Sequence, residues 1–239
     1  MTPSAPDFSD RVVLVTGVAR VGQIGHAVAE AFGRAGARIV ACDKNAVAVA
    51  KRAAEFTAAG LEARPAAGDL TEPDVAHLAV EVALREFGRL DAVVNVAGGL
   101  TTYGPFTAAS VADVDREIAI NLKTCMVVSQ AAIEALADSR GAIVNFASIA
   151  FFRPDPNLVI YSAAKSAVAG FTRALAVELA PRGVRVNAVA PSMVRTTENV
   201  TATGPDADYV EMHEITDGVL RLAADPSMTG EIVRIARGV

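Results

Sequence analysis

The chain has 239 residues, of which 52% are hydrophobic and 21% are charged, and its formal net charge is −5. This composition excludes a disordered chain, and the absence of any cluster of Lys and Arg argues against nucleic acid as a partner. We therefore expect a single packed domain over residues 1–239 that acts on a small molecule.

The cysteines and the N-terminal stretch indicate the compartment in which the chain works. Cys42 and Cys125 lie far apart in the sequence and neither belongs to a C-x-x-C pair, so neither a disulfide framework nor a metal site is predicted. No segment reaches the roughly 18 apolar residues that a membrane span needs, and the chain does not open on a basic segment followed by an apolar core. We expect a cytoplasmic protein with no membrane partner and no bound metal.

Short apolar runs rich in Val and Ile recur along the chain, and each is predicted to be a buried strand. They cover residues 12–16, 38–42, 63–67, 92–96, 142–147, 184–189 and 231–235. Segments with helical spacing lie between them, over residues 24–35, 46–59, 73–87, 111–136, 160–179 and 207–223. Such an alternation predicts a parallel sheet covered on both faces, because right-handed crossovers place the helices there. The expected fold class is α/β, a doubly wound parallel sheet in a three-layer sandwich of the Rossmann type.

One polar segment interrupts this alternation after the sixth strand. Residues 196–208 read TTENVTATGPDAD, which is polar and contains a Gly-Pro pair, so a loop is predicted. Parallel sheets of this kind bind ligands at the carboxyl ends of their strands, and the loop follows such an end. We expect residues 196–212 to form a mobile substrate lid.

The turn between the first strand and the first helix contains glycines spaced G-x4-G-x2-G, at Gly17, Gly22 and Gly25. This spacing differs from the G-x-G-x-x-G of the standard dinucleotide fingerprint. In the predicted fold, the helix that begins near Ile24 has its N-terminus at the carboxyl edge of the sheet, where its free N–H groups and its dipole favour a pyrophosphate. A tight turn without a ligand is the alternative, and the glycine pattern alone leaves both open.

Polar motifs follow the later strands in a fixed order. N-x-A-G begins at Asn95, Ser148 follows the fifth strand, Y-x-x-x-K joins Tyr161 to Lys165, and P-x-x-V-x-T begins at Pro191. Together with the T-G that ends the first strand, their order and spacing resemble those of the short-chain dehydrogenase/reductase family over essentially the whole chain. The resemblance implies a nicotinamide-dependent oxidoreductase that assembles as a homotetramer or homodimer.

The resemblance also implies roles for individual residues. The catalytic tetrad of the family falls on Asn121, Ser148, Tyr161 and Lys165. The cofactor-binding positions of the family fall on Gly17, Arg20, Gly22, Gln23 and Ile24 around the pyrophosphate, on Asp69 and Leu70 at the adenine, on Asn95, Ala97 and Gly98 at the adenosine, and on Tyr161, Lys165, Pro191, Val194 and Thr196. The glycine turn is two residues longer than the family's usual T-G-x-x-x-G-x-G, which leaves open which of residues 20–23 contacts phosphate.

These tetrad residues supply what hydride transfer between an alcohol and a carbonyl requires. A free tyrosine with a pKa of about 10 is a poor base at neutral pH. Lys165 shares a helix face with Tyr161, and its ammonium together with the positive charge of the oxidised nicotinamide favours the phenolate, whereas desolvation opposes it. Ser148 can hydrogen-bond the substrate oxygen, and the resemblance implies that Asn121 binds a water linking Lys165 to solvent.

Asp43, at the end of the second strand, indicates the choice of coenzyme. A carboxylate there can accept hydrogen bonds from both ribose hydroxyls of NAD, and it would place like charges in contact with the 2′-phosphate of NADP. We therefore expect NAD(H), with NADP less favoured. Lys44 and Arg20 are basic residues that could bind a 2′-phosphate instead, and Asp43 could serve only as the N-cap of the next helix.

The preferred hypothesis is an oxidoreductase that transfers a hydride between NAD(H) and an alcohol or ketone, with Tyr161 as the acid/base. The nearest alternative is an NADPH-dependent 3-oxoacyl reductase. A dinucleotide-binding or sensing protein without catalytic activity is the alternative from another class, and the presence of both Tyr161 and Lys165 argues against it. No motif names the substrate.

Overall fold

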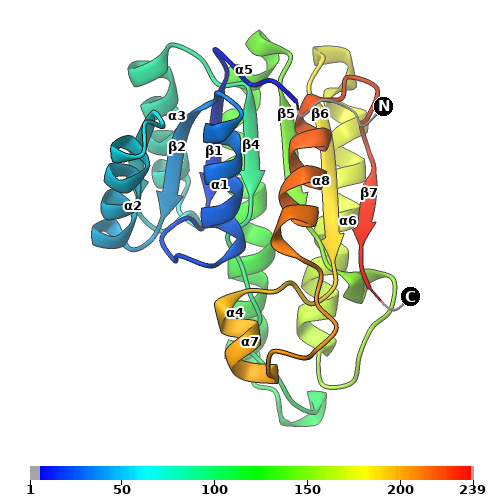
Figure 1. Cartoon of the computed structure of the whole chain (residues 1–239). Helices are drawn as coiled ribbons and strands as arrows, with labels where there is room; N and C mark the ends of the chain where they lie inside the picture. The colour runs from blue at the N-terminus through cyan, green and yellow to red at the C-terminus, as the bar shows by residue number, and fades with distance from the viewer. Residues whose placement is uncertain (1–5, 238–239) are drawn as a thin grey trace, which may run out of the picture.

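The computed structural model describes residues 6–237, and a seven-stranded sheet forms its centre (Figure 1). The strands pair in the order β3-β2-β1-β4-β5-β6-β7, and all six pairings are parallel. Their bounds are β1 Val12–Thr16, β2 Arg38–Asp43, β3 Ala63–Ala67, β4 Ala92–Asn95, β5 Ala142–Phe146, β6 Arg185–Pro191 and β7 Ile232–Ile235. The seven predicted strands are confirmed, with ends that differ from the predicted ones by two residues or fewer.

Helices cover both faces of this sheet, which makes the molecule a three-layer, Rossmann-like α/β sandwich. On one face lie α1 (Ile24–Arg34), α2 (Ala46–Ala58) and α8 (Met212–Ala224), with α1 and α8 in front of the sheet in Figure 1. On the other face lie α3 (Pro73–Phe87), α5 (Thr124–Ser139) and α6 (Val159–Leu179). The predicted doubly wound fold is confirmed.

Strand β1 shows why its apolar run is continuous. Val13 and Val15 pack into the cluster under α1 and α8, whereas Val12 and Leu14 pack into the cluster under α3 and α5. Successive side chains of a strand point to opposite faces, and here both faces are covered, so every position is buried. The parallel sheet therefore brings the carboxyl ends of its strands to one edge, where the polar motifs lie.

The helical segment predicted over residues 111–136 is helical throughout, but a π-helical turn interrupts its α-helical geometry. The segment consists of α4 (Val111–Ile118), a π-helical turn η2 (Ala119–Lys123) and α5. The N–H of Thr124 donates to the carbonyl of Ala119, and its hydroxyl donates to the carbonyl of Ile120 at 2.8 Å. One extra residue fits into the turn without disturbing the apolar spacing on either side, so the periodicity did not signal it.

The predicted loop over residues 196–208 is partly helical. α7 (Thr197–Thr203) begins after Thr196, whose hydroxyl accepts a hydrogen bond from the Asn199 N–H at 3.1 Å. Helix α8 begins at Met212 rather than at residue 207. Its start is set by a reciprocal capping box between Glu211 and Glu214. In Figure 1 the strand arrowheads point toward the end of the molecule where α7 lies.

Short helical turns complete the chain: η1 (Phe106–Ala108), η3 (Ile149–Phe151) and η4 (Ala180–Arg182). Over residues 6–237, no helix is both long enough and apolar enough to cross a membrane. Within the same part of the chain, no three His, Cys, Asp or Glu side chains gather in a way that could hold a metal ion.

Candidate active site

A cleft of about 660 Å³ opens at the carboxyl edge of the sheet, between the loops that follow β1, β2, β3 and β4. Nine of the residues predicted to bind a cofactor line it: Gly17, Arg20, Gln23, Ile24, Asp43, Asp69, Leu70, Ala97 and Gly98. The first turn, the second strand end and the N-x-A-G segment are far apart in sequence, and the parallel topology brings them to one place.

The glycine turn is shaped by close backbone contacts. Gly17 has a φ of +76°, and a Cβ there would lie 3.2 Å from the Cα of Ala97. A Cβ on Gly25 would lie 2.2 Å from the carbonyl oxygen of Gly17, so α1 begins directly against the turn. Gln23 is the N-cap of α1 and its side chain makes no capping hydrogen bond. The N-terminal N–H groups of α1 are therefore positioned to accept an anion in the cleft.

Helix α7 lies against the rim of this turn. Arg20 pairs with Glu198 of α7 at 2.8 Å, and the N–H of Thr197 donates to the carbonyl of Gly22 at 3.3 Å. The segment predicted to be a lid thus contacts the segment predicted to bind phosphate. Both side chains of the ion pair are more than half exposed, so it contributes little stability.

Asp43 closes β2 and faces the cleft. One carboxylate oxygen accepts a hydrogen bond from the N–H of Ala19 at 3.0 Å, and the other accepts one from the N–H of Asn45 at 3.0 Å. The N-cap of α2 is Asn45, whose side chain accepts from the N–H of Ala48. The alternative that Asp43 serves only as that N-cap is therefore wrong.

Asp69 and Leu70 follow β3, the strand beside β2, and line the wall of the cleft next to Asp43. Leu70 is buried, and the Asp69 carboxylate accepts hydrogen bonds from the N–H and the hydroxyl of Thr71. These hydrogen bonds hold the pKa of Asp69 below its ordinary value. A rigid, charged loop end forms this wall.

Asn95 is not among the residues that line the cleft, because its side chain points into the core. Its Nδ2 donates to the hydroxyl of Ser129 at 3.0 Å and to Oδ1 of Asn145 at 2.9 Å. Asn145 in turn donates to the hydroxyl of Thr172. This buried network ties β4 and β5 to α5 and α6, and it fixes the start of the segment that carries Ala97 and Gly98.

Ser148, Tyr161 and Lys165 come together where β5 ends and α6 begins. The Lys165 ammonium lies 5.9 Å from the centre of the Tyr161 ring and donates to the carbonyl of Phe146 at 2.8 Å. Ser148 is buried, and its hydroxyl offsets part of the rise that burial causes in the pKa of Tyr161. The helical spacing of four residues places Tyr161 and Lys165 on one face of α6, as the sequence predicts.

Burial dominates the acid–base properties of this pair. It raises the pKa of Tyr161 above its ordinary value, and Ser148 only partly offsets that effect. It lowers the pKa of Lys165 from 10.5 to about 8. The free chain thus holds the tyrosine protonated and the lysine poised to lose its proton.

Asn121 lies in the π-helical turn and clamps the chain that follows β4. Its Nδ2 donates to the carbonyl of Gly99 at 2.9 Å, and its Oδ1 accepts from the N–H of Gly99 at 3.1 Å. Nδ2 also donates to the carboxylate of Glu117 at 3.1 Å. The turn places Asn121 inside the molecule, buried beside α6.

Three further predicted residues lie at the end of the sixth strand or just after it, outside the lining of the cleft: Pro191, Val194 and Thr196. Pro191 ends β6, Val194 is buried and forms a bridge with Val210, and Thr196 caps α7. Their backbone fixes where α7 begins.

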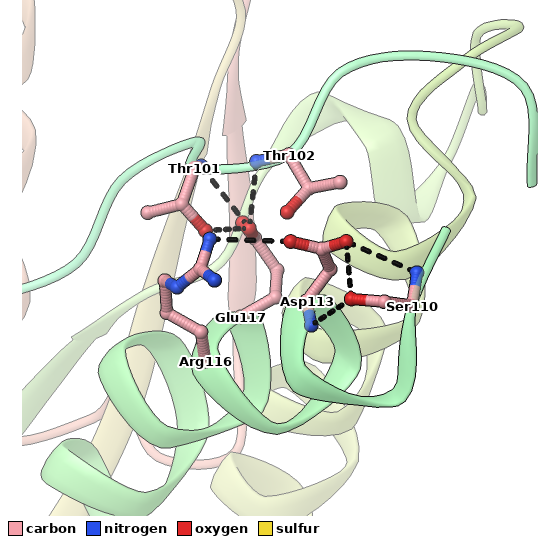
Figure 2. A network of polar contacts seen from close by, with 6 residues as sticks. All are labelled: Thr101, Thr102, Ser110, Asp113, Arg116 and Glu117. Carbon is pink, nitrogen blue, oxygen red and sulfur yellow. Dashed lines mark hydrogen bonds and ion pairs between the residues drawn. The ribbon is translucent and has the colours of Figure 1, made fainter. Parts of the chain in front are cut away.

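Sequence reasoning missed Glu117, a fully buried carboxylate in α4. Figure 2 shows it between Thr101 and Thr102, which donate hydrogen bonds to it. In a segment that reads VADVDREIAINLK, one more acidic residue is typical of a solvated helix face. Its position four residues before Asn121, on the same helix face, was the available signal.

Comparison with known proteins agrees with this geometry. The family model described as short chain dehydrogenase matches residues 11–207. The 3-oxoacyl-[acyl-carrier-protein] reductase of Synechocystis sp. is 33% identical, with 96% of each chain covered. The D-threitol dehydrogenase of Mycolicibacterium smegmatis is 37% identical, covering 84% of this chain and 77% of the relative.

A solved structure is similar over nearly the whole molecule. It is the crystal structure of a Sinorhizobium meliloti 1021 protein proposed to be a short-chain alcohol dehydrogenase, with a TM-score of 0.87, 31% identity and 97% of both chains covered. Fold, site and relatives together define an oxidoreductase of the Rossmann-like class. The chain belongs to the short-chain dehydrogenase family, whose members generally bind NAD or NADP.

Proposed function

We propose that the chain interconverts an alcohol and a carbonyl compound with NAD(H) as its coenzyme. The observation that carries this proposal is that Ser148, Tyr161 and Lys165 gather where β5 ends and α6 begins, at the same carboxyl edge of the sheet as the cleft with the glycine turn. None of the three lines the cleft itself. An acid–base group, a hydroxyl donor and a buried cation in this arrangement suit proton exchange with a substrate oxygen.

The cleft fits a dinucleotide. The close contacts of Gly17 and Gly25 leave a cradle of backbone beside the N-terminus of α1, which suits a pyrophosphate. Asp43, Asp69 and Leu70 would hold the adenosine half of the coenzyme, and Asn121, Tyr161 and Lys165 would act at its nicotinamide half. When bound, the nicotinamide ring supplies the hydride chemistry that no side chain can supply.

In the proposed reaction the residues of this chain orient the substrate oxygen and move its proton. The hydroxyls of Ser148 and Tyr161 would hold the substrate oxygen, and Tyr161 would take up or give its proton. Lys165, whose ammonium is already within 5.9 Å of the Tyr161 ring, would stabilise the phenolate. In the free chain the pKa of Tyr161 lies above its ordinary value, so we propose that the tyrosine is activated only when coenzyme is bound.

Asp43 supports NAD rather than NADP. Its carboxylate is held at the cleft by two backbone N–H groups, and it would repel a 2′-phosphate. Arg20, the basic residue of the turn, is already paired with Glu198. Both contacts favour a coenzyme without the additional phosphate.

The alternative function is an NADPH-dependent 3-oxoacyl reductase, favoured by the 33% identity to the Synechocystis enzyme. Similarity to D-threitol dehydrogenase favours a small alcohol as substrate instead. A panel of alcohols, ketones and 3-oxoacyl thioesters, assayed with both coenzymes through the absorbance of the reduced nicotinamide, separates the two. We expect turnover of an alcohol or ketone with NAD(H); turnover of the thioester with NADPH alone would support the alternative, and dinucleotide binding without turnover would support a sensor.

The remaining features of the proposal concern the whole chain. We propose one domain over residues 1–239, with residues 196–212 as a substrate lid, and a homodimer or homotetramer packed through the region of α4, α5 and α6. Exposed apolar side chains on these helices support the interface: Val111, Ile118, Met126, Val159 and Val177. The buried free thiols of Cys42 and Cys125 suit the reducing cytoplasm.

A further inference from the structure

Glu117 is a buried carboxylate in α4 to which the proposed reaction assigns no role. Oε2 accepts hydrogen bonds from the N–H groups of Thr101 and Thr102, both at 3.1 Å, and from the hydroxyl of Thr101 (Figure 2). Oε1 accepts one from Nδ2 of Asn121 at 3.1 Å. The two backbone N–H groups can only donate, so Oε2 serves as an acceptor for this segment. A buried carboxyl is tolerated only when hydrogen bonds satisfy it in this way.

Backbone groups set the orientation of the Asn121 amide, and the Glu117 side chain adds to them. Nδ2 donates to the backbone carbonyl of Glu117 at 3.1 Å as well as to its Oε1. Oδ1 is then turned to the N–H of Gly99 at 3.1 Å, while Nδ2 also reaches the carbonyl of Gly99 at 2.9 Å. Glu117 thereby holds the segment of residues 99–102, which follows the cleft residue Gly98, against the π-helical turn.

The same carboxylate is a fixed negative charge near the acid–base pair. Helix α4 packs against α6. Burial is the largest influence on both pKa values, raising that of Tyr161 and lowering that of Lys165, and Glu117 adds a smaller upward contribution to each. The other titratable group that acts on Lys165 is Cys125 of α5, whose own pKa burial raises to about 12, so it is neutral at physiological pH. The neighbouring Arg116 is paired with Asp113 at 3.2 Å, on the exposed side of α4 (Figure 2).

We propose that Glu117 is a positioning residue for the reaction, which holds the Asn121 amide and the Thr101–Thr102 backbone in place and sets the charge beside the Tyr161–Lys165 pair. The proposal rests on the proposed function only for its effect on turnover. Its effects on Asn121 and on the titration of Tyr161 need neither coenzyme nor substrate, so they can be measured on the free chain.

The test substitutes Glu117→Gln, which keeps the size of the side chain and removes its charge. A glutamine that accepts from Thr101 and Thr102 must turn its NH₂ toward the NH₂ of Asn121, so two donors meet and the Asn121 amide is displaced. We expect kcat to fall by roughly ten- to a hundredfold. Asp115→Asn is the matched control, because Asp115 is an exposed acid two residues earlier in α4, and it leaves kcat unchanged.

A second readout needs no substrate. The chain has 3 tyrosines, so the tyrosinate absorbance of the free chain, compared with that of Tyr161→Phe, isolates the titration of Tyr161. Glu117 raises the pKa of Tyr161, so Glu117→Gln moves this titration to lower pH, and Asp115→Asn leaves it in place. A folded Glu117→Gln chain with an unmoved titration overturns the proposal, even if no substrate is ever turned over.

Glu117→Asp covers the case in which Glu117→Gln does not fold. Its carboxylate is one methylene shorter and cannot reach both Asn121 and the Thr101–Thr102 backbone, although it keeps the charge. We expect faster hydrogen exchange at the amides of Thr101 and Thr102, with lower kcat and a titration of Tyr161 close to the original pH. Exchange at the original rate with full kcat overturns the positioning role.

Discussion

At the scale of single residues, the protonation state of Tyr161 in the free chain decides how the site works. The sequence predicts that Lys165 favours the phenolate, whereas burial raises the pKa of the tyrosine and lowers that of the lysine. Burial shifts both pKa values in these directions because removal from water penalises the charged form of each group, the phenolate of Tyr161 and the ammonium of Lys165. The positive charge of an oxidised nicotinamide is therefore the missing contribution that we propose for activation.

Lys165→Met should raise stability while it lowers activity. The lowering of the Lys165 pKa from 10.5 to about 8 corresponds to about 3 kcal/mol against the buried ammonium. This cost is fully present below about pH 8, where the lysine is charged in both states, and it disappears as the pH rises toward 10.5. We expect the Met variant to gain up to about 3 kcal/mol in the free energy of unfolding near pH 7, and to lose that gain near pH 10.

Denaturant unfolding at the two pH values measures this difference, and Lys51→Met in α2 is the control, because Lys51 is exposed. Turnover and coenzyme affinity should both fall in the Lys165 variant alone. A stability difference between the two chains that is the same near pH 7 and near pH 10 would contradict the assigned cost of the buried ammonium.

At the scale of single elements, the end of β2 sets the position of Asp43 and thereby the expected choice of coenzyme. The hydrogen bonds from Ala19 and Asn45 hold both of its oxygens at the cleft. We expect kcat/KM with NAD to exceed that with NADP by at least about tenfold, which corresponds to roughly 1.4 kcal/mol. Asp43→Ser should shrink this ratio mainly by improving NADP.

Initial rates with each coenzyme measure the ratio, and Asp217→Ser, at an exposed position of α8, is a control that removes a carboxylate outside both the cleft and the proposed lid. A ratio that does not change in Asp43→Ser would mean that Arg20 and Lys44 govern the choice of coenzyme.

Elements also show where sequence reasoning succeeds and fails. Strand β1 is buried on both faces, so its apolar run predicts it directly. The π-helical turn at Ala119–Lys123 depends on hydrogen bonds made by Thr124, and the apolar spacing does not encode them. Helix α7 is short, polar and rich in Thr, so its composition indicates a loop, and its cap at Thr196 and its contacts with the glycine turn stabilise it instead.

The site could be predicted where its residues form motifs, and not where they act through tertiary contacts. Tyr161 and Lys165 are four residues apart on α6, and their spacing alone places them together. Glu117 becomes notable only when the chain after β4 folds back onto α4 and buries its carboxylate. Asn95 is the reverse case. Its motif predicts a cofactor contact, whereas its side chain makes hydrogen bonds inside the core.

At the scale of the whole molecule, the topology explains why one edge of the sheet carries the chemistry. Parallel strands end together, so loops from β1 to β6 converge there although they are separated by more than a hundred residues. Helix α7 contacts the glycine turn through an exposed ion pair and a backbone hydrogen bond, and its other hydrogen bonds, such as that from Asn199 Nδ2 to the carbonyl of Val194 at 2.8 Å, stay within residues 193–210. We propose that a segment held mostly by its own contacts moves as a lid when a substrate enters and leaves.

The central claim is that Tyr161 exchanges the proton of an alcohol or ketone during nicotinamide-dependent hydride transfer. Its most direct test compares the original chain with Tyr161→Phe, in rate of nicotinamide reduction or oxidation on the best substrate of the panel and in coenzyme affinity. The ring keeps its packing and loses only the hydroxyl, so turnover should fall by at least about a hundredfold while coenzyme affinity stays nearly unchanged. Near-original turnover in Tyr161→Phe would contradict the claim.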